Sequence, residues 1–343
     1  MWFQSFARPL LFRIEPERAH GLTIQMLKRK PLKAGPVDDP VLASSVAGLH
    51  FPNPVGLAAG VDKNAEVPLQ FLDLGFGFAE VGTVTPLPQA GNPRPRIFRL
   101  PEDRAIINRL GFNNAGQKAA IDRLKLYARR PGPIGVNIGA NKDSPDRIAD
   151  YAKGARAMCP YADYLTVNIS SPNTPGLRAL QDKGMLEALL SAVIENNHHD
   201  CPVFLKIAPD LEPADVEDIA EVAIDRNVAA LIISNTTISR PPLTSANAGE
   251  TGGLSGAPLA GLALERLIAF RAVCGTAIPL VSVGGIASGA DAYARIRAGA
   301  SLIQLYTALI YEGPELGRRI ARDLASLLRR DGFSSLSEAV GMV

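Results

Sequence analysis

Eight short runs of apolar and β-branched residues, separated by stretches with helical spacing, constrain the fold of this chain more than any other feature. The runs cover residues 54–59, 78–85, 134–139, 164–170, 203–208, 230–236, 280–285 and 302–308. Eight strands that alternate with helices predict an α/β fold, the (β/α)8 TIM barrel. A doubly wound sheet is the alternative, but its glycine-rich turn should follow the first strand. Here the turn Val283-Gly284-Gly285-Ile286 follows the seventh run, where a barrel commonly binds phosphate.

Two segments beside these runs bear on the organisation of the chain. Residues 46–51 are expected to form a small hairpin under the barrel. Residues 86–110 are rich in Pro and Arg and are predicted to form a long loop after the second strand. Loops of that length in a compact domain are usually functional. The predicted organisation is a helical extension over residues 1–38 and a barrel domain over residues 39–343.

The first 34 residues differ from the rest of the chain in charge and in the spacing of their apolar residues. They hold seven basic and two acidic side chains, a net charge of +5, whereas the whole chain carries +2. Two short helical patterns follow each other, with Trp2, Phe3, Phe6, Leu10, Leu11 and Ile14 in the first and Leu22, Met26 and Leu27 in the second. Such helices can pack on the core or lie on an anionic membrane surface, and composition alone leaves both open. Nucleic acid is not an expected partner, because no basic and aromatic stripe continues into the barrel.

The ends of the predicted strands collect the polar residues, and chemistry in a barrel takes place at this face. They are Lys63, Thr83, Asn137, Asn168, Ser171, Asn173, Lys206, Asn235, Thr236, Gly285, Tyr306 and Thr307. Apart from Asp62 the set has no carboxylate, which disfavours a glycosidase with two carboxylates and metal-dependent hydrolysis. The three cysteines and four histidines show no ligand spacing, so no metal site is expected. Each asparagine alone could be an ordinary turn residue, but several together suit a flat ligand with donors and acceptors along its edge.

Several longer motifs occur in a fixed order along the chain. They are LAAGVDK at 57–63, EVGTVTP at 80–86, INRLGFNN at 107–114, NISSPNTPG at 168–176, the segment 203–210, NTT at 235–237, TGGLSG at 251–256 and VGGI at 283–286. From about residue 13 to residue 315, the sequence resembles the membrane-associated, quinone-dependent dihydroorotate dehydrogenases. These are flavin enzymes of pyrimidine synthesis. The resemblance implies an FMN cofactor, dihydroorotate and orotate as ligands, a membrane quinone as oxidant, and a peripheral position on the cytoplasmic side of the cell membrane.

The resemblance also implies a role for individual residues. For FMN it implies Ala59, Gly60, Val61, Asp62, Lys63, Thr83, Asn137, Asn168, Lys206 and Ser234, with Gly256, Gly285, Tyr306 and Thr307 around the phosphate. Ser234 stands where threonine is expected, and the hydroxyl is retained. For the substrate it implies Lys63, Asn108, Arg109, Leu110, Gly111, Phe112, Asn168, Asn173, Asn235 and Thr236. For the quinone pocket it implies His20, Arg99 and Tyr306.

Ser171 is the residue that the resemblance implies as the catalytic base. Soluble relatives carry cysteine at this place, so the serine and the N-terminal extension together favour the quinone-using branch. Three alternatives remain open at this stage. The same oxidation could serve a soluble enzyme that reduces fumarate or a nicotinamide. The barrel could be a membrane-docked binding protein without turnover. Lys206 could form a Schiff base, as in barrel aldolases.

Overall fold

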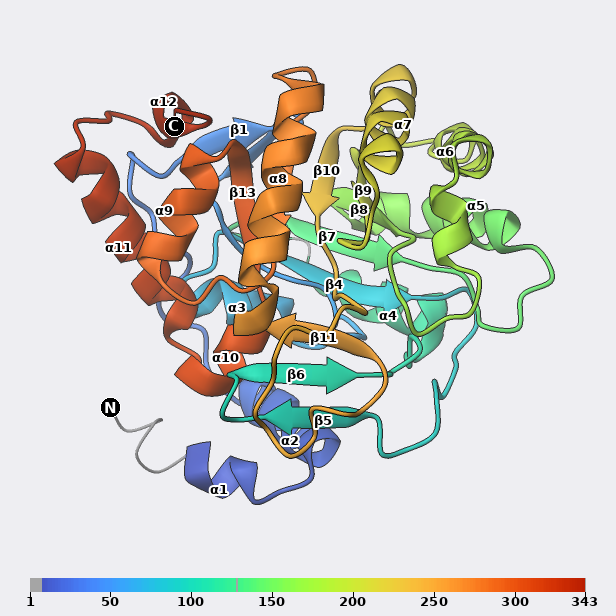
Figure 1. Cartoon of the computed structure of the whole chain (residues 1–343), viewed down its shortest axis with the longest axis horizontal. Helices are drawn as coiled ribbons and strands as arrows, with labels where there is room; N and C mark the ends of the chain where they lie inside the picture. Colours follow the sequence, from blue (N-terminus) through green and yellow to red (C-terminus); the bar gives the residue numbers. More distant parts are fainter. Residues whose placement is uncertain (1–7, 128, 343) are drawn as a thin grey trace.

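The computed structural model describes residues 8–127 and 129–342, and a closed barrel of eight parallel strands lies at its centre (Figure 1). In barrel order the strands are β3 (Val55–Leu57), β4 (Phe78–Val84), β7 (Ile134–Ile138), β8 (Tyr164–Asn168), β9 (Val203–Lys206), β10 (Ala230–Ile233), β12 (Leu280–Val283) and β13 (Ala300–Leu305). Each predicted run overlaps one of these strands, so the predicted barrel is confirmed.

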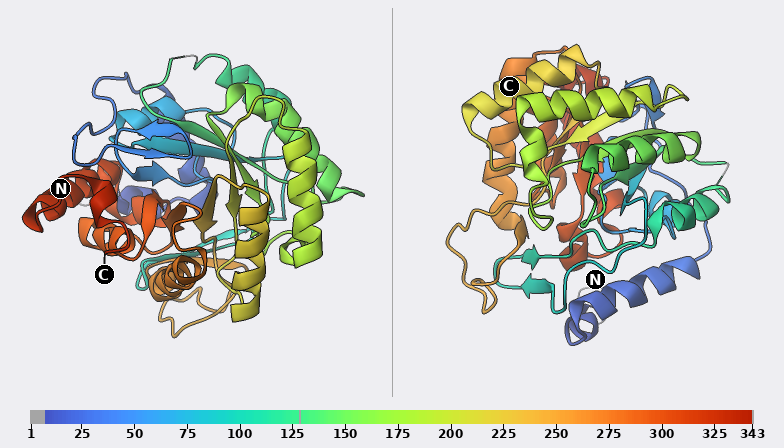
Figure 2. Two further views of the ribbon diagram at one scale, coloured as in Figure 1. Left: turned by 90° about the horizontal axis from the view of Figure 1, so that it is seen from above. Right: turned by 90° about the vertical axis from the view of Figure 1, so that its right-hand side faces the viewer.

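Helices surround the barrel, and at least one follows each strand (Figure 2). They are α3 (Pro68–Asp73), α4 (Gly116–Leu124), α5 (Arg147–Met158), α6 (Lys183–Glu195), α7 (Pro213–Asp225), α8 (Ala260–Cys274), α9 (Gly289–Arg297), α10 (Thr307–Glu312), α11 (Leu316–Arg330) and the short α12 (Leu336–Ala339). Short 3₁₀ helices lie at Cys159–Tyr161, Arg178–Gln181 and Ala257–Leu259. Helix α11 shows why these segments pack as they do. Its residues Leu316, Ile320, Leu324 and Leu328 recur every four positions and are all buried, so one stripe of the helix faces the barrel.

The end of the barrel at which the strands begin is closed by aromatic side chains. Phe51, Phe78, Tyr164 and Phe204 form a row of ring contacts with centroid distances from 4.4 to 6.5 Å. Glycines on the neighbouring strands make room for these rings, because a Cβ atom at Gly56 would lie 2.2 Å from the Phe78 ring. Phe51 belongs to the hairpin of β1 (Ser44–Val46) and β2 (Leu49–Phe51), which confirms the hairpin predicted at 46–51. Since side chains fill this end, the space for a ligand lies at the opposite end.

The prediction of a long loop over residues 86–110 is wrong. This segment contains strands β5 (Ile97–Leu100) and β6 (Ala105–Asn108), which pair as an antiparallel hairpin. A distant strand, β11 (Gly253–Gly256), completes a three-stranded sheet by pairing with β6. The sheet buries Phe98, Leu100, Ala105, Ile107 and Leu254 in a small core of its own. It lies at the end of the barrel opposite the β1–β2 hairpin (Figure 1).

Two helices of the N-terminal segment lie beside this sheet, α1 (Arg8–Phe12) and α2 (Pro16–Lys28) (Figures 1 and 2). Pro16 starts α2, and the Glu15 side chain accepts the N–H groups of Glu17 and Arg18. Trp2, Phe3 and Phe6, which belong to the predicted first helix, lie outside the described residues. Among the described residues, no helix is long and apolar enough to cross a membrane.

Candidate active site

A cavity of about 590 Å³ runs from the carboxyl ends of the barrel strands to helices α1 and α2. Its size lies in the usual range for sites that bind small molecules. The predicted site residues on its wall are His20, Ala59, Gly60, Val61, Lys63, Thr83, Arg99, Asn108, Leu110, Gly111, Phe112, Asn168, Ser171, Asn173, Lys206, Ser234, Asn235, Thr236, Gly256, Gly285, Tyr306 and Thr307. The structure therefore brings together residues from every predicted group.

The polar side chains at the strand ends are joined to one another by hydrogen bonds. Asn168 Nδ2 donates to Thr83 Oγ1 at 3.0 Å and to Asn137 Oδ1 at 3.1 Å. Ser170 Oγ donates to Asn168 Oδ1 at 2.7 Å, and Asn235 Nδ2 donates to Ser170 Oγ at 2.8 Å. Because these side chains are joined in this way, their donors and acceptors are oriented before any ligand arrives.

Two lysines supply positive charge to the cavity wall. Lys63 Nζ donates to the Gly60 carbonyl at 2.8 Å, and burial lowers the pKa of this ammonium to about 8. Lys206 ends β9 and is almost completely buried. Burial lowers the pKa of Lys206, and the negative charge of Glu80 opposes that shift. Both buried ammonium groups therefore favour an anionic ligand, because a nearby negative charge offsets the cost of removing them from water.

Ser171 lies in the loop directly after β8 and is buried at the mouth of the barrel. Its Oγ accepts the backbone N–H of Asn173 at 3.3 Å, and Asn173 Nδ2 in turn donates to Asn108 Oδ1 on β6. The loop is also held by Arg178, which donates to the Ser170 carbonyl at 3.1 Å. The serine hydroxyl is therefore fixed between the barrel and the three-stranded sheet.

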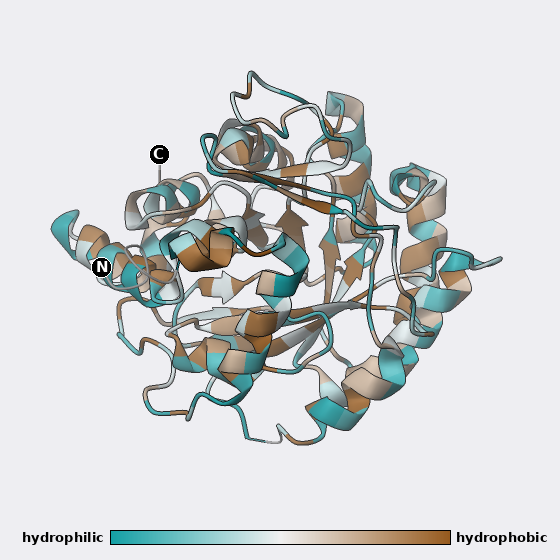
Figure 3. Ribbon diagram, turned by 90° about the horizontal axis from the view of Figure 1, so that it is seen from below, coloured by the Kyte–Doolittle hydropathy of each residue, from teal (hydrophilic) through white to brown (hydrophobic). Residues whose placement is uncertain are grey.

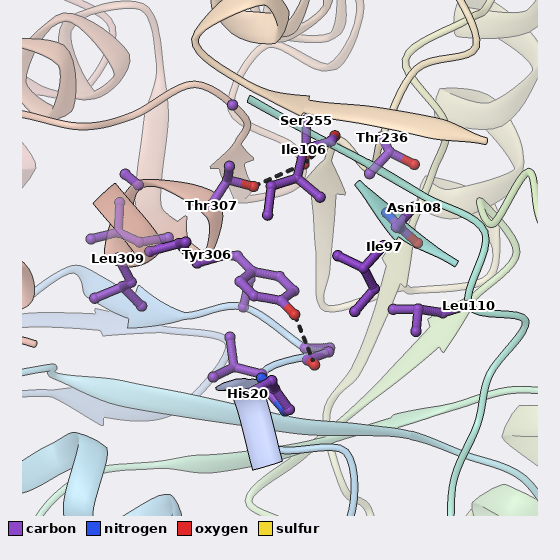
Figure 4. A pocket seen from close by; sticks show the side chains of 18 of the residues that line it. His20, Ile97, Ile106, Asn108, Leu110, Thr236, Ser255, Tyr306, Thr307 and Leu309 are labelled. Carbon is purple, nitrogen blue, oxygen red and sulfur yellow. Dashed lines mark hydrogen bonds between the residues drawn. The ribbon is translucent and has the colours of Figure 1, made fainter. Parts of the chain in front are cut away.

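Glycines and hydroxyls form a separate part of the wall near β11 and α10. Gly256 and Gly285 adopt positive φ angles of 99° and 72°, which few other residues tolerate. A Cβ atom on Gly285 would lie 2.5 Å from the backbone of Ala260, so the two chain segments need glycine to approach so closely. Thr307 Oγ1 donates to Ser255 Oγ at 2.8 Å beside them (Figure 4). Exposed backbone amides and hydroxyls of this kind suit a phosphate group.

The part of the cavity next to α1 and α2 is apolar, with a few polar groups. His20 and Tyr306 both face into it (Figure 4), and the Tyr306 hydroxyl donates to the Gly60 carbonyl at 3.3 Å. Burial is the main reason that the pKa of His20 falls to about 3, so this imidazole is neutral at physiological pH. Arg99 donates to the Ile14 carbonyl at 2.8 Å and lies over the Phe12 ring. This end can therefore hold a flat, largely apolar molecule with a few polar atoms.

Helix α2 is fixed to the barrel by an ion pair that the sequence did not reveal. Glu17 accepts hydrogen bonds from Arg96 at 2.6 and 3.0 Å and from Arg94 at 3.0 Å. Arg96 also donates to the Ala90 and Asn92 carbonyls in the segment before β5. A second ion pair joins Lys28 to a glutamate near α3 at 2.6 Å. The partners are too far apart in the sequence for a pattern to indicate them.

Three predicted site residues do not line the cavity. Asp62 is buried and accepts the N–H groups of two residues in the turn before α3, so its carboxylate shapes that turn. The Arg109 side chain points to Glu250, with a distance of 2.7 Å. Asn137 lies one layer below the wall, beneath Thr83 and Asn168. Within the described part of the chain, no three His, Cys, Asp or Glu side chains are grouped as metal ligands.

With this geometry in place, comparison with known proteins identifies the family. The sequence matches the dihydroorotate dehydrogenase family over residues 41–328. The chain belongs to this family. It is 62% identical over 338 residues to dihydroorotate dehydrogenase (quinone) of Erythrobacter litoralis, with 98% of both chains covered. The protein of the same name from Sphingopyxis alaskensis is 61% identical, with 98% of this chain and 96% of the relative covered.

Solved structures of family members agree with the fold. The crystal structure of DHODH from Eimeria tenella in complex with ferulenol superposes with a TM-score of 0.92 at 40% identity. It covers 97% of this chain and 98% of its own. The ligand-free form from the same organism gives a TM-score of 0.91 at 41% identity, with 95% and 99% covered. A dihydroorotate dehydrogenase is an oxidoreductase, so the chain is an enzyme with an α/β barrel as its catalytic fold.

Proposed function

We propose that this enzyme oxidises dihydroorotate to orotate, using FMN in the cavity and a membrane quinone as the final oxidant. The proposal rests mainly on one observation. The same cavity is lined by Ser171 and the strand-end amides and by His20 and Arg99 beside α1 and α2. In this proposal, the substrate site and the exit for electrons share one cavity. The relatives named as quinone-dependent enzymes at about 60% identity support the same conclusion.

The residues present fit FMN. The positive-φ glycines Gly256 and Gly285, with Thr307, form the cradle for its phosphate. Gln304 supports the fit, because its Oε1 is buried on the cavity wall without a hydrogen-bond partner among the described residues. Bound FMN supplies the hydride acceptor for the reaction. The ammonium of Lys206 then stabilises negative charge that develops at the strand ends during reduction, since a fixed cation in a dry site acts strongly.

Orotate is a flat ring with carbonyls, ring N–H groups and a carboxylate. The amides of Asn108, Asn173 and Asn235 supply both donors and acceptors for the ring edge. Lys63 supplies the counter-charge for the carboxylate. Ser171 Oγ takes the proton from ring carbon C5, while the hydride leaves from C6, so the C5–C6 single bond becomes a double bond. A serine is a weak base, and it can serve here because it is held in place and because hydride loss makes the C5 proton more acidic.

The N-terminal helices are proposed to be the membrane-binding and quinone-binding part, at the cytoplasmic side of the cell membrane. Leu10, Leu22 and Met26 are exposed large apolar residues on α1 and α2, and Arg8, Arg18 and Lys28 lie on the same helices. The ribbon seen from below carries both hydrophobic and hydrophilic residues along its helices (Figure 3). An exposed apolar stripe with basic neighbours is typical of helices that lie in a lipid surface. The cavity reaches these helices, so a quinone bound there would lie beside the proposed lipid surface.

The test begins with the colour of the purified protein. FMN binding predicts a yellow protein that dihydroorotate bleaches under anaerobic conditions. A quinone should then restore the colour faster than fumarate or a nicotinamide. A yellow protein that dihydroorotate does not bleach would contradict the proposed substrate, and fastest reoxidation by fumarate or a nicotinamide would contradict the quinone.

A further inference from the structure

Glu80 is a carboxylate inside the barrel that no step of the reaction uses. It lies in the middle of β4 with none of its surface exposed. Oε1 accepts Asn137 Nδ2 at 2.8 Å, and Oε2 accepts Gln304 Nε2 at 2.8 Å. The hydroxyls of Thr166 and Tyr164 also donate to Oε2, at 3.1 and 3.3 Å. A buried charge is costly unless it is compensated, and four donors with the nearby Lys206 ammonium provide that compensation.

The two amides that donate to Glu80 contact different oxygens of its carboxylate. Asn137 turns its oxygen toward the mouth, where Thr83 donates to it at 2.5 Å and Asn168 at 3.1 Å. The chain of donors continues upward from Asn168 through Ser170 to Asn235. Each member donates toward Glu80 and accepts from the member above it.

Gln304 forms the second branch from the same carboxylate. Its Nε2 donates to Glu80, and its Oε1 is the buried acceptor on the cavity wall that has no partner among the described residues. An amide can present either atom to a neighbour, but an ionised carboxylate only accepts. The side-chain atom that faces Glu80 must therefore be nitrogen in both amides, and both oxygens must point toward the mouth.

We propose that Glu80 is the positioning residue that sets the donor and acceptor direction of the amides at the mouth. The substrate part of this proposal rests on the proposed function. A glutamine at position 80 would offer one oxygen where the carboxylate offers two. One of the two amides would then meet an NH2 group and would have to turn. If Asn137 turned, its nitrogen would face the nitrogen of Asn168. If Gln304 turned, the cavity would lose its acceptor.

Glu80→Gln tests the proposal because it keeps the size of the side chain and removes its charge. We expect orotate to bind about tenfold more weakly or worse, as for the loss of one charged hydrogen bond in a network. We also expect a more positive flavin midpoint potential, because removing a negative charge from beneath the amides at the mouth favours the reduced, anionic flavin. A tenfold shift of that equilibrium is about 30 mV for two electrons. A merely structural role would not raise the potential.

The matched control is Thr166→Val, which removes one donor to Glu80 and keeps both its charge and the amide chain. It should leave the orotate affinity within about twofold of the parent and the midpoint potential within about 9 mV, which is a twofold shift for two electrons. Glu80→Gln protein with full FMN content, parent-like orotate affinity and an unchanged or lower potential would overturn the proposal.

A neutron crystal structure of the parent protein in heavy water provides a test that needs no variant and no activity. We expect deuterium on Asn137 Nδ2 and Gln304 Nε2, both facing Glu80, and none on the carboxylate. Deuterium on Glu80, or an amide oxygen facing it, would overturn the proposal even if the enzyme oxidises dihydroorotate. Conversely, a parent protein that fails to bind orotate contradicts the proposed function and leaves the neutron result to decide on Glu80.

Discussion

The barrel wall of the cavity and the wall formed by α1 and α2 are held by different kinds of interaction. In the barrel wall, buried amides and hydroxyls bond to one another across β4, β7 and β8, and they continue downward to a buried carboxylate. Helices α1 and α2 expose several large apolar residues and are attached by a few ion pairs and carbonyl contacts. The barrel wall can therefore keep a fixed geometry for chemistry, while the helical wall can loosen without disturbing it.

This difference makes the two walls separable by experiment. Changes in the barrel wall should affect the reduction of the enzyme by dihydroorotate. Changes in the helical wall should affect its reoxidation by quinone and its attachment to lipid. A variant in one wall that altered both half-reactions equally would show that the walls are coupled more tightly than the contacts indicate.

The largest effect is expected for Ser171→Ala in the barrel wall. The variant should retain FMN but should be reduced by dihydroorotate some 10²–10⁴-fold more slowly, the range for loss of a positioned base. Anaerobic stopped-flow measurement of flavin bleaching gives this rate directly. Ser171→Cys should recover part of it, because a thiol at the same place can also take the proton. Reduction of Ser171→Ala within about threefold of the parent would exclude this serine as the base.

A hundredfold effect on membrane attachment is expected when the helical wall loses its exposed apolar residues. Leu10 and Leu22 are 61% and 48% exposed and do not line the cavity. Replacing both with Glu should weaken liposome binding about 100-fold, since burying each leucine contributes roughly 1.5–3 kcal/mol. Bleaching by dihydroorotate should remain at the parent rate.

The control for this change is the pair Leu126→Glu and Ile238→Glu, which alters two exposed apolar residues elsewhere on the surface. Flotation with anionic liposomes should separate the two double variants. Equal loss of flotation in both would show that general surface charge, and not the helical wall, controls attachment.

The sequence predicted the residues of the barrel wall far better than the contacts that hold the two walls in place. Strand ends can be read from apolar runs, and the polar residues just beyond them line the cavity as expected. The role of Glu80 could not be predicted in the same way, because this residue lies in the middle of an apolar run and not at a strand end. The pairing of β6 with β11 joins segments about 145 residues apart, and the contact of Glu17 with Arg96 spans 79 residues. Partners at such distances depend on how the barrel closes, so local patterns could not indicate them.

A smaller effect is expected for the ion pair that attaches α2. Glu17 binds two arginines that differ in burial, since the Arg96 side chain is 5% exposed and that of Arg94 is 70% exposed. Glu17→Gln should lower the free energy of opening α2 by about 2 kcal/mol, because it weakens a hydrogen-bonded pair with a buried cation. Arg94→Gln should cost at most about 0.5 kcal/mol, as for other exposed pairs. Hydrogen exchange of the α2 amides measures both, and equal costs would contradict the role of burial.

The smallest effect concerns pH and the helical wall alone. Burial lowers the pKa of His20 from 6.5 to about 3, so α2 binds the barrel only with a neutral imidazole. When α2 opens, His20 regains its ordinary pKa and takes up a proton, so acid favours the open form between pH 6.5 and about 3. Docking of α2 is therefore strongest above pH 6.5, and it should weaken by at most about 1 kcal/mol between pH 6.5 and 5.5. Over that interval Glu17 and Lys63 keep their charge in both forms, because the pKa of Glu17 lies below its usual 4.5 and that of Lys63 is about 8.

Hydrogen exchange of α2, corrected for the intrinsic effect of pH, should show this loss of docking in the parent but not in His20→Gln. The control is His198→Gln, which replaces an exposed histidine beyond α6 and should respond to acid like the parent. An identical acid response in His20→Gln would assign the loss to another group.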